Sequence, residues 1–427
     1  MTLPSTLSGW LEYIERQHPQ SIALGLDRVN VVRDALSLKP EFPLITVGGT
    51  NGKGSACMML DAVLGCAGYR VGTYTSPHLL RYNERVRIGG REAGDADLVR
   101  AFAAVEQART VCNVPLTYFE FGTLAAVWLF CESRVDVAIL EVGLGGRLDA
   151  VNAFDADAAL LMSVGLDHMD YLGDTREAIG FEKAHIFRAA RPAICADAEP
   201  PATVADYAAG IGADLLLIGR DFSYQAQPQQ WSYRGPGGDR HGLPLPALRG
   251  SFQLANASAC ITALDTLRGR LPVTTGNIRD GLVRVENPGR FQALPGRPTM
   301  ILDVAHNPHA AAALATNLAQ MTGYRNTLAV FSMLKDKDVA GVARVLRGHV
   351  DHWLVASLEG ARALPAAELE QYLRAAGVTV PIIICANIAE ACDRAYQMAG
   401  DGDRILAFGS FLTVAAAMTA VRARRDR

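Results

Sequence analysis

The sequence predicts an α/β protein with two domains, each built on a mostly parallel β-sheet that is covered by helices. Short apolar runs alternate with stretches of helical spacing along most of the chain, which is typical of parallel sheets. The length of 427 residues is enough for two or three separate cores. A stretch with three prolines, "VENPGRFQALPGRPT", interrupts the alternation at about residues 287–297. We therefore expect a first domain over residues 1–290, with a small β edge, and a Rossmann-like second domain over residues 291–427.

The sheet of the first domain is predicted to begin with the apolar run "FPLITVGG", which leads directly into a glycine-rich loop. The next stretch, "KGSACMMLDAVLGCAGYR", has helical apolar spacing, and "VGTYTSPHLL" then predicts a second strand with its exit loop. Strand, loop, helix and strand in this order form the context that a phosphate-binding loop requires.

Two further strands are predicted in "VDVAILEVG" and "AALLMSVGLDH", and we interpret Glu141 and His168 as the polar residues at their ends. Ligands bind at the carboxyl ends of the strands in open α/β sheets. Together with Lys53 and Ser76, which follow the first two strands, these residues are expected to meet in one crevice.

Two other regions complete the expected fold. Residues 220–250 contain many turn formers and aromatic residues without a helical period, which predicts hairpins at the edge of the first domain. Beyond residue 297, strands and helices alternate again, from "MILDVAHNPHAAAALATNLAQ" to "DRILAFGSFLTVAAAM". This alternation predicts the second α/β domain.

The composition limits the classes of function. Half of the residues are hydrophobic and a fifth are charged, which excludes disordered and fibrous proteins. The net charge of -3 gives no support to a nucleic-acid or membrane-surface role, so neither partner is expected. The start has no basic segment followed by an apolar core, and a cytoplasmic protein is expected. Eight cysteines without a C-x-x-C pair indicate reduced thiols rather than disulfides or a zinc site.

The glycine-rich loop "GGTNGKGS" departs twice from the usual phosphate-loop pattern G-x-x-x-x-G-K-[ST]. Val47 stands where the first glycine belongs, and Gly54 stands where a hydroxyl residue normally follows the lysine. A plain glycine turn is the alternative, but N–H groups at a helix N-terminus bind phosphate, and a lysine adds charge against it. The predicted nucleotide-binding residues of this loop are Gly49, Thr50, Asn51, Gly52, Lys53, Gly54 and Ser55.

A magnesium site is predicted from Ser76, Glu141 and His168, because Mg²⁺ requires hard oxygen ligands that neighbouring strand ends can supply in part. Taken singly, each residue has a simpler interpretation. Ser76 would cap a helix before Pro77, Glu141 would be a charge at a strand end, and His168 would be a core histidine. The phosphate loop favours the metal site.

Other candidates are weaker on the residues alone. Lys183 in "GFEKAHIF" is most simply a surface lysine paired with a nearby acid. In the second domain, "DVAHNP" places Asp303 and His306 at a strand end. Arg290 in "PGRF" would either form an ion pair within its loop or reach a nucleotide, where it would stabilise charge during phosphoryl transfer.

Taken together, these segments resemble the folylpolyglutamate synthases, specifically the bacterial enzymes that are also dihydrofolate synthases, which are relatives of the Mur ligases of cell-wall synthesis. The resemblance runs through "LGLDRV", "VGGTNGKGS", "YTSPHL", "YFEFGTLAA", "LEVGLGGRLDAVN", "GLDHMDYLG", "EKAHIF", "NPGRFQ", "DVAHNP", "DKD" and "FGSFLTV". So many segments in the family's order make chance agreement implausible. The resemblance implies a Mur-ligase-type ATP-binding domain followed by a glutamate-ligase domain.

The family's pattern implies two magnesium sites and a modified lysine. The first Mg²⁺ is implied at Ser76 and Glu141, so that a serine from another strand supplies the hydroxyl missing from the loop. The second is implied at His168 and is shared with Glu141. Lys183 is implied to carry a carbamate formed with carbon dioxide, which would turn a cation into an anionic oxygen donor near the metals.

The resemblance also implies residues that contact each substrate. Those implied to contact ATP, besides the loop, are Asn256, Arg290 and Asp303. Those implied for the incoming glutamate are His306 and Ser410. Those implied for the pterin pocket of the bifunctional enzymes are Thr117, Phe119, Asp149 and Ala150, although a phenylalanine in "YFEF" is otherwise simply a core residue.

The implied activity joins L-glutamate to dihydropteroate and then to reduced folates. ATP phosphorylates a carboxylate, and the amine of L-glutamate attacks the acyl phosphate to give an amide, ADP and phosphate. The catalytic residues implied are Lys53, Lys183, His168 and Arg290. The two domains are expected to close over the acyl phosphate and exclude water, and a monomer is expected.

Three other functions were weighed. An enzyme that only extends the glutamate tail is the nearest, and the segments of the pterin pocket favour both activities. A nucleotide-switch GTPase requires a guanine-reading N-K-x-D motif, and none occurs in the chain. A Mur-type cell-wall ligase usually has a further N-terminal substrate domain, whereas 46 residues precede Val47 here.

Overall fold

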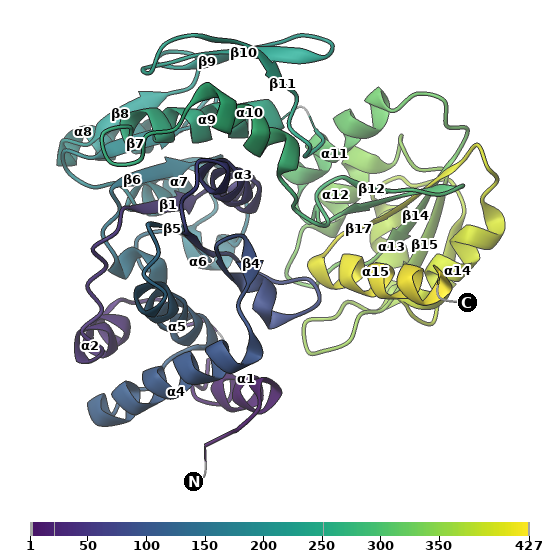
Figure 1. Ribbon diagram of the computed structural model, residues 1–427. Coiled ribbons are helices and arrows are strands. Elements are labelled where there is room, and N and C mark those ends of the chain that lie inside the picture. The colour runs from purple at the N-terminus through teal and green to yellow at the C-terminus, as the bar shows by residue number, and fades with distance from the viewer. Residues whose placement is uncertain (1–2, 21, 251, 426–427) are drawn as a thin grey trace. The chain divides into compact units, whose positions relative to one another are not determined.

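The computed structural model describes residues 3–20, 22–250 and 252–425, and it divides into two compact units (Figure 1). Within the described residues, the first unit runs to Ala247 and resumes over Leu254–Val285, and the second runs from Glu286 onward and includes the short segment before Leu254. This division falls close to the predicted domain boundary, whose placement between residues 290 and 291 stays a prediction.

The first unit contains a mostly parallel sheet, as predicted, and its eight strands have the order β4-β3-β2-β5-β1-β6-β7-β8. Only β3 and β4, at one edge, pair antiparallel. The strands are β1 (Leu44–Gly48), β2 (Val71–Tyr74), β3 (Val86–Ile88), β4 (Arg91–Glu92), β5 (Val137–Glu141), β6 (Ala158–Leu161), β7 (Pro192–Cys195) and β8 (Asp214–Leu217). All residues of β1 and β5 are buried, because helices cover both faces of a sheet of this kind.

The helices of the first unit include several that the sequence analysis did not predict, among them α1 and α2 near the N-terminus. They are α1 (Leu7–Glu15), α2 (Asp27–Ala35), α3 (Lys53–Cys66), η1 (Tyr82–Arg85), α4 (Asp95–Cys112), α5 (Tyr118–Glu132), η2 (Ala150–Ala153), α6 (Met169–Leu172), α7 (Arg176–Ala184), α8 (Ala202–Ile211), α9 (Gln253–Thr266) and α10 (Thr275–Arg284). In Figure 1, α4 and α5 lie on one side of the sheet, and α9 and α10 lie on the other.

The strand order explains why functional residues from distant segments meet. Strand β1 lies between β5 and β6, and β2 lies on the far side of β5. Val47 pairs in register with Glu141, and Gly48 pairs with Leu161. The exits of β1, β2, β5 and β6 are therefore neighbours at the carboxyl edge of the sheet, where ligands bind in such folds.

Helices α3 and α10 pack so closely that one glycine is required between them. A Cβ added at Gly281 would lie 2.5 Å from Cα of Val63. We expect Gly281→Ala to lower the free energy of unfolding by about 1–3 kcal/mol, because the two backbones would have to move apart. Thermal unfolding measures this effect.

The matched control is Gly276→Ala in the same helix, where the nearest atom to the added Cβ is 3.6 Å away. That variant is expected to unfold at the wild-type temperature or above it, since alanine favours the helix more than glycine does. Equal melting temperatures for the two variants would contradict the close contact.

The predicted hairpins are confirmed, but they do not extend the edge of the main sheet. Strands β9 (Ser223–Ala226), β10 (Gln230–Arg234) and β11 (Arg240–Pro244) form a separate antiparallel sheet. Tyr233 of β10 hydrogen-bonds Thr262 of α9 at 2.9 Å, and Arg240 forms an ion pair with Asp265 of the same helix. The hairpins therefore lie on α9, because their aromatic and charged side chains find partners there.

The second unit is a six-stranded sheet in the order β12-β13-β17-β14-β15-β16, in which only β12 is antiparallel. Its strands are β12 (Gln292–Leu294), β13 (Thr299–Asp303), β14 (Thr327–Phe331), β15 (His352–Ala356), β16 (Ile382–Cys385) and β17 (Arg404–Phe408). Its helices are α11 (Pro308–Gln320), α12 (Val339–Leu346), α13 (Ala366–Ala375), α14 (Ile388–Met398) and α15 (Phe411–Arg425). This arrangement confirms the predicted second α/β fold.

Candidate active site

The glycine-rich loop joins β1 to α3, and two of its glycines adopt conformations that other residues rarely reach. Gly49 has φ 137° and Gly52 has φ 89°. A Cβ on Gly52 would lie 2.9 Å from Oδ1 of Asn256, so this predicted ATP contact lies beside the loop. No side chain caps the N-terminus of α3, which leaves the helix suited to an anion.

The loop is held in shape by the exit of β6 and by its own lysine. Nζ of Lys53 donates to the carbonyls of Gly49 (3.0 Å) and Thr50 (3.2 Å). The N–H of Thr50 donates to the carbonyl of Ser163, and the N–H of Asn51 donates to the hydroxyl of Ser163. The ammonium group therefore lies over the backbone that would cradle a phosphate.

Ser76 and Glu141 lie together, as the magnesium prediction requires. The backbone N–H of Ser76 donates to Oε2 of Glu141 at 3.0 Å. Glu141 is the last residue of β5 and only 3% exposed, and Ser76 follows β2 by two residues. The interpretation of Ser76 as a helix cap is wrong, because no helix begins at Pro77. A serine hydroxyl and a carboxylate at this edge are hard oxygen donors that fit Mg²⁺.

His168 does not stand at the end of a strand, which corrects the prediction. Strand β6 ends at Leu161, and His168 precedes the short helix α6 in a left-handed conformation with φ 52°. Its backbone N–H donates to Oδ1 of Asp167 at 2.9 Å. Its side chain is one-third exposed, so it is not a core histidine. The loop after β6 is thus longer than the apolar run suggested.

Lys183 is buried, so the expectation of a surface lysine is wrong. It lies in the last turn of α7 and is 5% exposed. The pKa of Lys183 is lowered to about 7, mainly by burial and also by the charge of Lys53, against the opposing effects of Asp167 and Asp149. A large part of this amine is therefore neutral near pH 7, which an amine must be to react with carbon dioxide.

The residues implied for the pterin pocket lie at the start of α5 and in the loop after β5. Thr117 caps α5 by accepting from the N–H of Glu120, and the ring of Phe119 lies so close to Gly143 that a Cβ there would be 2.6 Å from it. Asp149 accepts from the N–H groups of Leu144 and Val151. Ala150 follows Asp149 and is buried.

Burial raises the pKa of Asp149 to about 6, although backbone N–H groups lower it in part. The folded state then binds a proton that the unfolded state, with a pKa near 3.8, has released. Stability due to this group is therefore lost as the pH rises from about 4 to about 6. We expect the free energy of unfolding of the wild type, relative to Asp149→Asn, to fall by up to about 3 kcal/mol across that range.

Urea unfolding of both proteins at pH 4 and at pH 7 tests this prediction. Asparagine can accept from only one of the two N–H groups that Asp149 binds, which is a cost that does not change with pH. The change in the difference between the two proteins from pH 4 to pH 7 therefore isolates the titration of Asp149. A difference between the two proteins that stays constant with pH would show that Asp149 titrates in its ordinary range.

In the second unit, the predicted residues gather where β13 ends. Oδ2 of Asp303 accepts from the N–H of Phe291, next to Arg290, and Oδ1 accepts from that of Ala305. The guanidinium of Arg290 lies 4.7 Å from the centre of the Phe411 ring. The centre of the His306 ring lies 6.2 Å from the centre of the same Phe411 ring. Burial raises the pKa of Asp303, and the charge of Arg290 opposes this shift.

Ser410 lies next to Phe411 in the same unit. Its hydroxyl hydrogen-bonds that of Thr413 at 2.7 Å and accepts from the N–H of Thr413. The structure thus brings Arg290, Asp303, His306 and Ser410 into one region of the second unit.

Several residues of the site region were missed by the sequence analysis. Arg28 forms an ion pair with Glu120 at 2.7 Å and donates to the carbonyl of Ala23, which ties the segment before α2 to the start of α5. Ser163 holds the phosphate loop, and Arg85 lies beside Tyr118. The capping pattern T-x-x-E in "TYFE" was a signal for Glu120, but partners distant in sequence leave no local signal.

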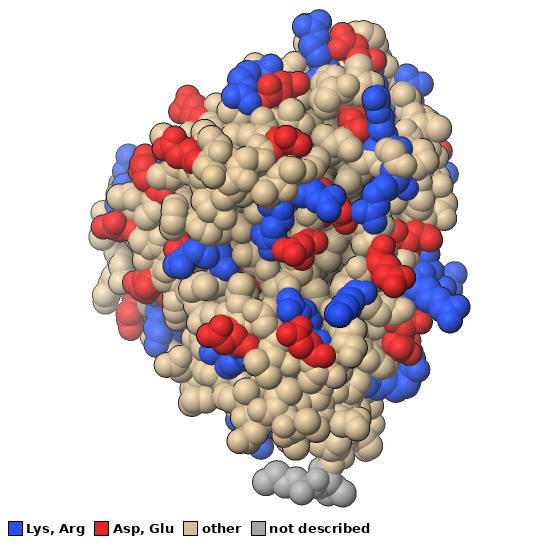
Figure 2. All heavy atoms as spheres, turned by 90° about the vertical axis from the view of Figure 1, so that its left-hand side faces the viewer, with Lys and Arg blue, Asp and Glu red and all other residues tan. Residues whose placement is uncertain are grey.

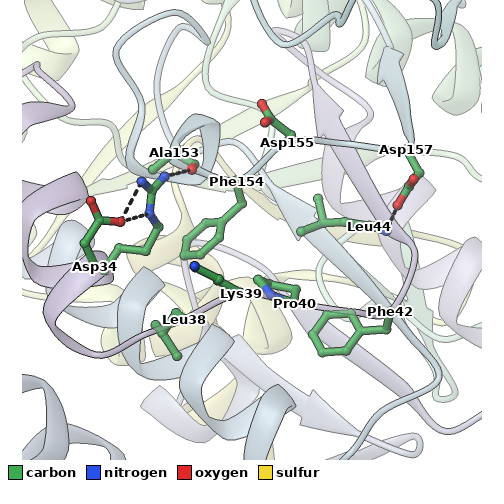
Figure 3. Close-up of a pocket in the computed structure, with 11 residues that line it drawn as sticks. Asp34, Leu38, Lys39, Pro40, Phe42, Leu44, Ala153, Phe154, Asp155 and Asp157 are labelled. Carbon is green, nitrogen blue, oxygen red and sulfur yellow. Dashed lines mark hydrogen bonds and ion pairs between the residues drawn. The ribbon is translucent and has the colours of Figure 1, made fainter.

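A separate cavity of about 280 Å³ lies at the amino end of β1, opposite the end that leads into the phosphate loop (Figure 3). It contains none of the predicted site residues. Arg33 in its wall pairs with Asp34 and donates to the carbonyl of Ala153, and Asp157 accepts from the N–H of Leu44. Arg33 and Asp157 are thus engaged in holding neighbouring segments together.

Three findings concern the expected partners. Among the described residues, no group of three or more His, Cys, Asp or Glu side chains is placed to hold a metal, and the predicted magnesium set has only two residues of these types. No helix in the described part of the chain is long and apolar enough to cross a membrane. Figure 2 shows Lys and Arg interspersed with Asp and Glu on one face.

Two family models match the chain. The Mur ligase middle domain matches residues 47–264, and the Mur ligase, glutamate ligase domain matches residues 289–411. A dihydrofolate synthase/folylpolyglutamate synthase of Escherichia coli is 45% identical over 424 residues, covering 99% of this chain and 97% of the relative.

Solved structures agree with these matches over the full length. Escherichia coli FolC in complex with DHPP and ADP superposes with a TM-score of 0.94 at 44% identity, covering 100% of both chains. A bifunctional folylpolyglutamate synthase/dihydrofolate synthase with Mn, AMPPNP and L-glutamate bound gives a TM-score of 0.90 at 42% identity, covering 99% of this chain and 100% of the other.

Proposed function

This chain belongs to the bifunctional dihydrofolate synthase/folylpolyglutamate synthases of the Mur ligase family, and we propose that it uses ATP to join L-glutamate to dihydropteroate and to reduced folates. The observation that carries this proposal is the meeting, at one sheet edge, of the phosphate loop with Lys53 and the Ser76–Glu141 pair. A relative with DHPP and ADP bound, and another with AMPPNP, Mn and L-glutamate bound, support it.

The phosphate loop and its lysine are proposed to bind ATP. Lys53 donates its ammonium to two loop carbonyls, and a bound triphosphate would offer it stronger, charged acceptors. Asn256, which lies beside Gly52, is proposed to contact the nucleotide. Arg290 and Asp303 are proposed as further ATP contacts from the second unit.

Ser76 and Glu141 are proposed to hold one Mg²⁺, and His168 with Glu141 a second. Magnesium bound there would neutralise charge on the phosphates as the terminal phosphoryl group moves to the substrate carboxylate. His168 would reach the site from the loop before α6 rather than from a strand end, and its side chain is one-third exposed.

Lys183 is proposed to carry a carbamate. The neutral amine attacks carbon dioxide, an N–C bond forms, and a proton is released to water. Its burial and lowered pKa favour the neutral amine that this reaction needs, and the resulting anion would lie close to the cationic Lys53. The carbamate would supply an anionic oxygen donor to the second metal.

The acyl phosphate formed on the substrate is proposed to react with the amine of L-glutamate. We assign His306 and Ser410 to the glutamate, and Thr117, Phe119, Asp149 and Ala150 to the pterin. A hydrolysable acyl phosphate requires the exclusion of water, and closure of the two domains is proposed to provide it.

The proposal is tested by measuring ADP release from the purified protein with ATP, Mg²⁺ and L-glutamate. One reaction contains dihydropteroate and the other contains tetrahydrofolate, and mass spectrometry identifies the products. Glutamate addition to both substrates is expected. Addition to tetrahydrofolate alone would identify an enzyme that only extends folates and would remove the dihydropteroate role from the pterin-pocket residues. Addition to neither would overturn the proposed function.

A further inference from the structure

Arg85 is a half-buried cation whose surroundings prepare it to bind an anion. It is the last residue of η1, and its guanidinium lies 5.4 Å from the ring centres of both Tyr82 and Tyr118. The two rings are 5.9 Å apart and nearly perpendicular, at 79°. They form a corner that limits how the guanidinium plane can turn, and cation–π attraction holds it there.

One side of the guanidinium is already fixed. Nε of Arg85 donates to Nδ1 of His78 at 2.8 Å, which leaves the two terminal nitrogens for another acceptor. Glu84, the adjacent acid in the sequence, is occupied elsewhere, because its carboxylate accepts from the N–H groups of Leu79 and Leu80 and also of Arg81. Among the residues that the structure describes, no carboxylate forms an ion pair with Arg85.

The position of Arg85 connects two parts of the candidate site. Its carbonyl accepts from the N–H of Thr75 at 2.9 Å, and the next residue, Ser76, is bonded to Glu141. On its other side, Tyr118 lies between Thr117 and Phe119, which are assigned to the pterin pocket. Arg85 therefore contacts the segment that carries Ser76 through its backbone, and the residue between Thr117 and Phe119 through its guanidinium.

We propose that Arg85 binds a carboxylate of the folate substrate through its two terminal nitrogens. This inference rests on the proposed function, since dihydropteroate and reduced folates both carry a carboxylate. A planar, preoriented guanidinium suits a carboxylate better than a lysine does, because it donates two parallel hydrogen bonds. The carboxylate is either the one that reacts, which both substrates have, or the α-carboxylate of a glutamate already attached, which only folates have.

The test compares Arg85→Met and Arg85→Lys with the wild type in steady-state assays with dihydropteroate and with tetrahydrofolate. Methionine retains the apolar contact with the tyrosine rings but cannot donate. We expect Arg85→Met to raise the KM of the folate substrate by roughly 10- to 100-fold, because a hydrogen-bonded charge is lost. The KM of ATP is expected to remain within about twofold, and Arg85→Lys is expected to recover only part of the loss.

The substrate that is affected identifies the carboxylate. A raised KM for both substrates assigns Arg85 to the carboxylate that reacts. A raised KM for tetrahydrofolate alone assigns it to the α-carboxylate of the glutamate already attached. The matched control is Arg81→Met, four residues earlier, where the side chain is 68% exposed and pairs with Glu92. This control is expected to behave as the wild type with both substrates.

Two outcomes would overturn the proposal. One is an unchanged KM for both substrates in Arg85→Met, and the other is an equal rise in the KM of ATP, which would show a general structural role. The wild-type assay distinguishes these from failure of the proposed function, because an inactive wild type would refute that function before any variant is compared.

Discussion

Replacing Lys53 by methionine is expected to lower kcat for ADP formation by roughly 10²- to 10³-fold, the range found when one preorganised electrostatic contact to a transition state is removed. Nζ of Lys53 lies over the loop backbone, 3.0 Å from the carbonyl of Gly49, where the phosphates are proposed to bind. Negative charge on the moving phosphoryl group would lose one of the cations proposed to neutralise it. ADP release with dihydropteroate at saturating ATP measures the effect.

The control for this variant is Lys39→Met, which removes an exposed lysine at the other end of β1. It is expected to keep wild-type kcat. Lys53→Met should still bind dihydropteroate, because the residues proposed for the pterin lie at the start of α5 and after β5. If Lys53→Met retains more than about a tenth of the wild-type kcat, the loop does not position phosphate as proposed.

Replacing Lys183 by methionine is expected to lower kcat by about 10²-fold or more, because the carbamate that would supply an anionic ligand cannot form. At the same time the free energy of unfolding at pH 7 is expected to rise. The folded-state pKa of Lys183 is about 7 and its unfolded value is 10.5, so wild-type stability increases with pH between these values. At pH 7 the wild type must release a proton from Lys183 on folding, which costs free energy. Methionine does not titrate, so the variant avoids this cost.

Activity and unfolding of Lys183→Met are to be measured on the same preparation, with Glu177→Gln on the exposed face of the same helix as a control. Loss of activity together with retained stability separates a chemical role from a structural one. Isotope-labelled bicarbonate should give a carbamate signal by NMR in the wild type and none in the variant. The signal should weaken below pH 7, where the amine is protonated. Full activity in bicarbonate-free buffer would contradict the carbamate.

Local patterns predicted the elements that depend on neighbours in the chain. The run "FPLITVGG" predicted β1 because every residue of a strand covered on both faces is apolar or small. The glycines at positions 49 and 52 predicted a phosphate loop because their φ values suit few other residues. The helical spacing of apolar residues predicted α3, and the alternation of strand and helix patterns predicted the second α/β domain.

Local patterns misplaced residues whose setting depends on distant segments. His168 was placed at a strand end because the apolar run continues past Leu161, where β6 stops pairing with its neighbours. The hairpins were predicted at the edge of the first domain, but no local pattern showed that Thr262 and Asp265 of a later helix hold them. Strand pairing and side-chain partners are non-local, so no window of sequence contains them.

By itself, the sequence determined that this protein has a nucleotide loop, a parallel α/β sheet and the segments of a glutamate ligase, because these are written in consecutive residues. Only the tertiary structure decided that Ser76 meets Glu141, that Arg85 lies between two tyrosines, and that Lys183 is buried with a pKa near 7. The reason is physical: the order of strands sets which exits are adjacent, and the surrounding chain sets how far a charge is removed from water.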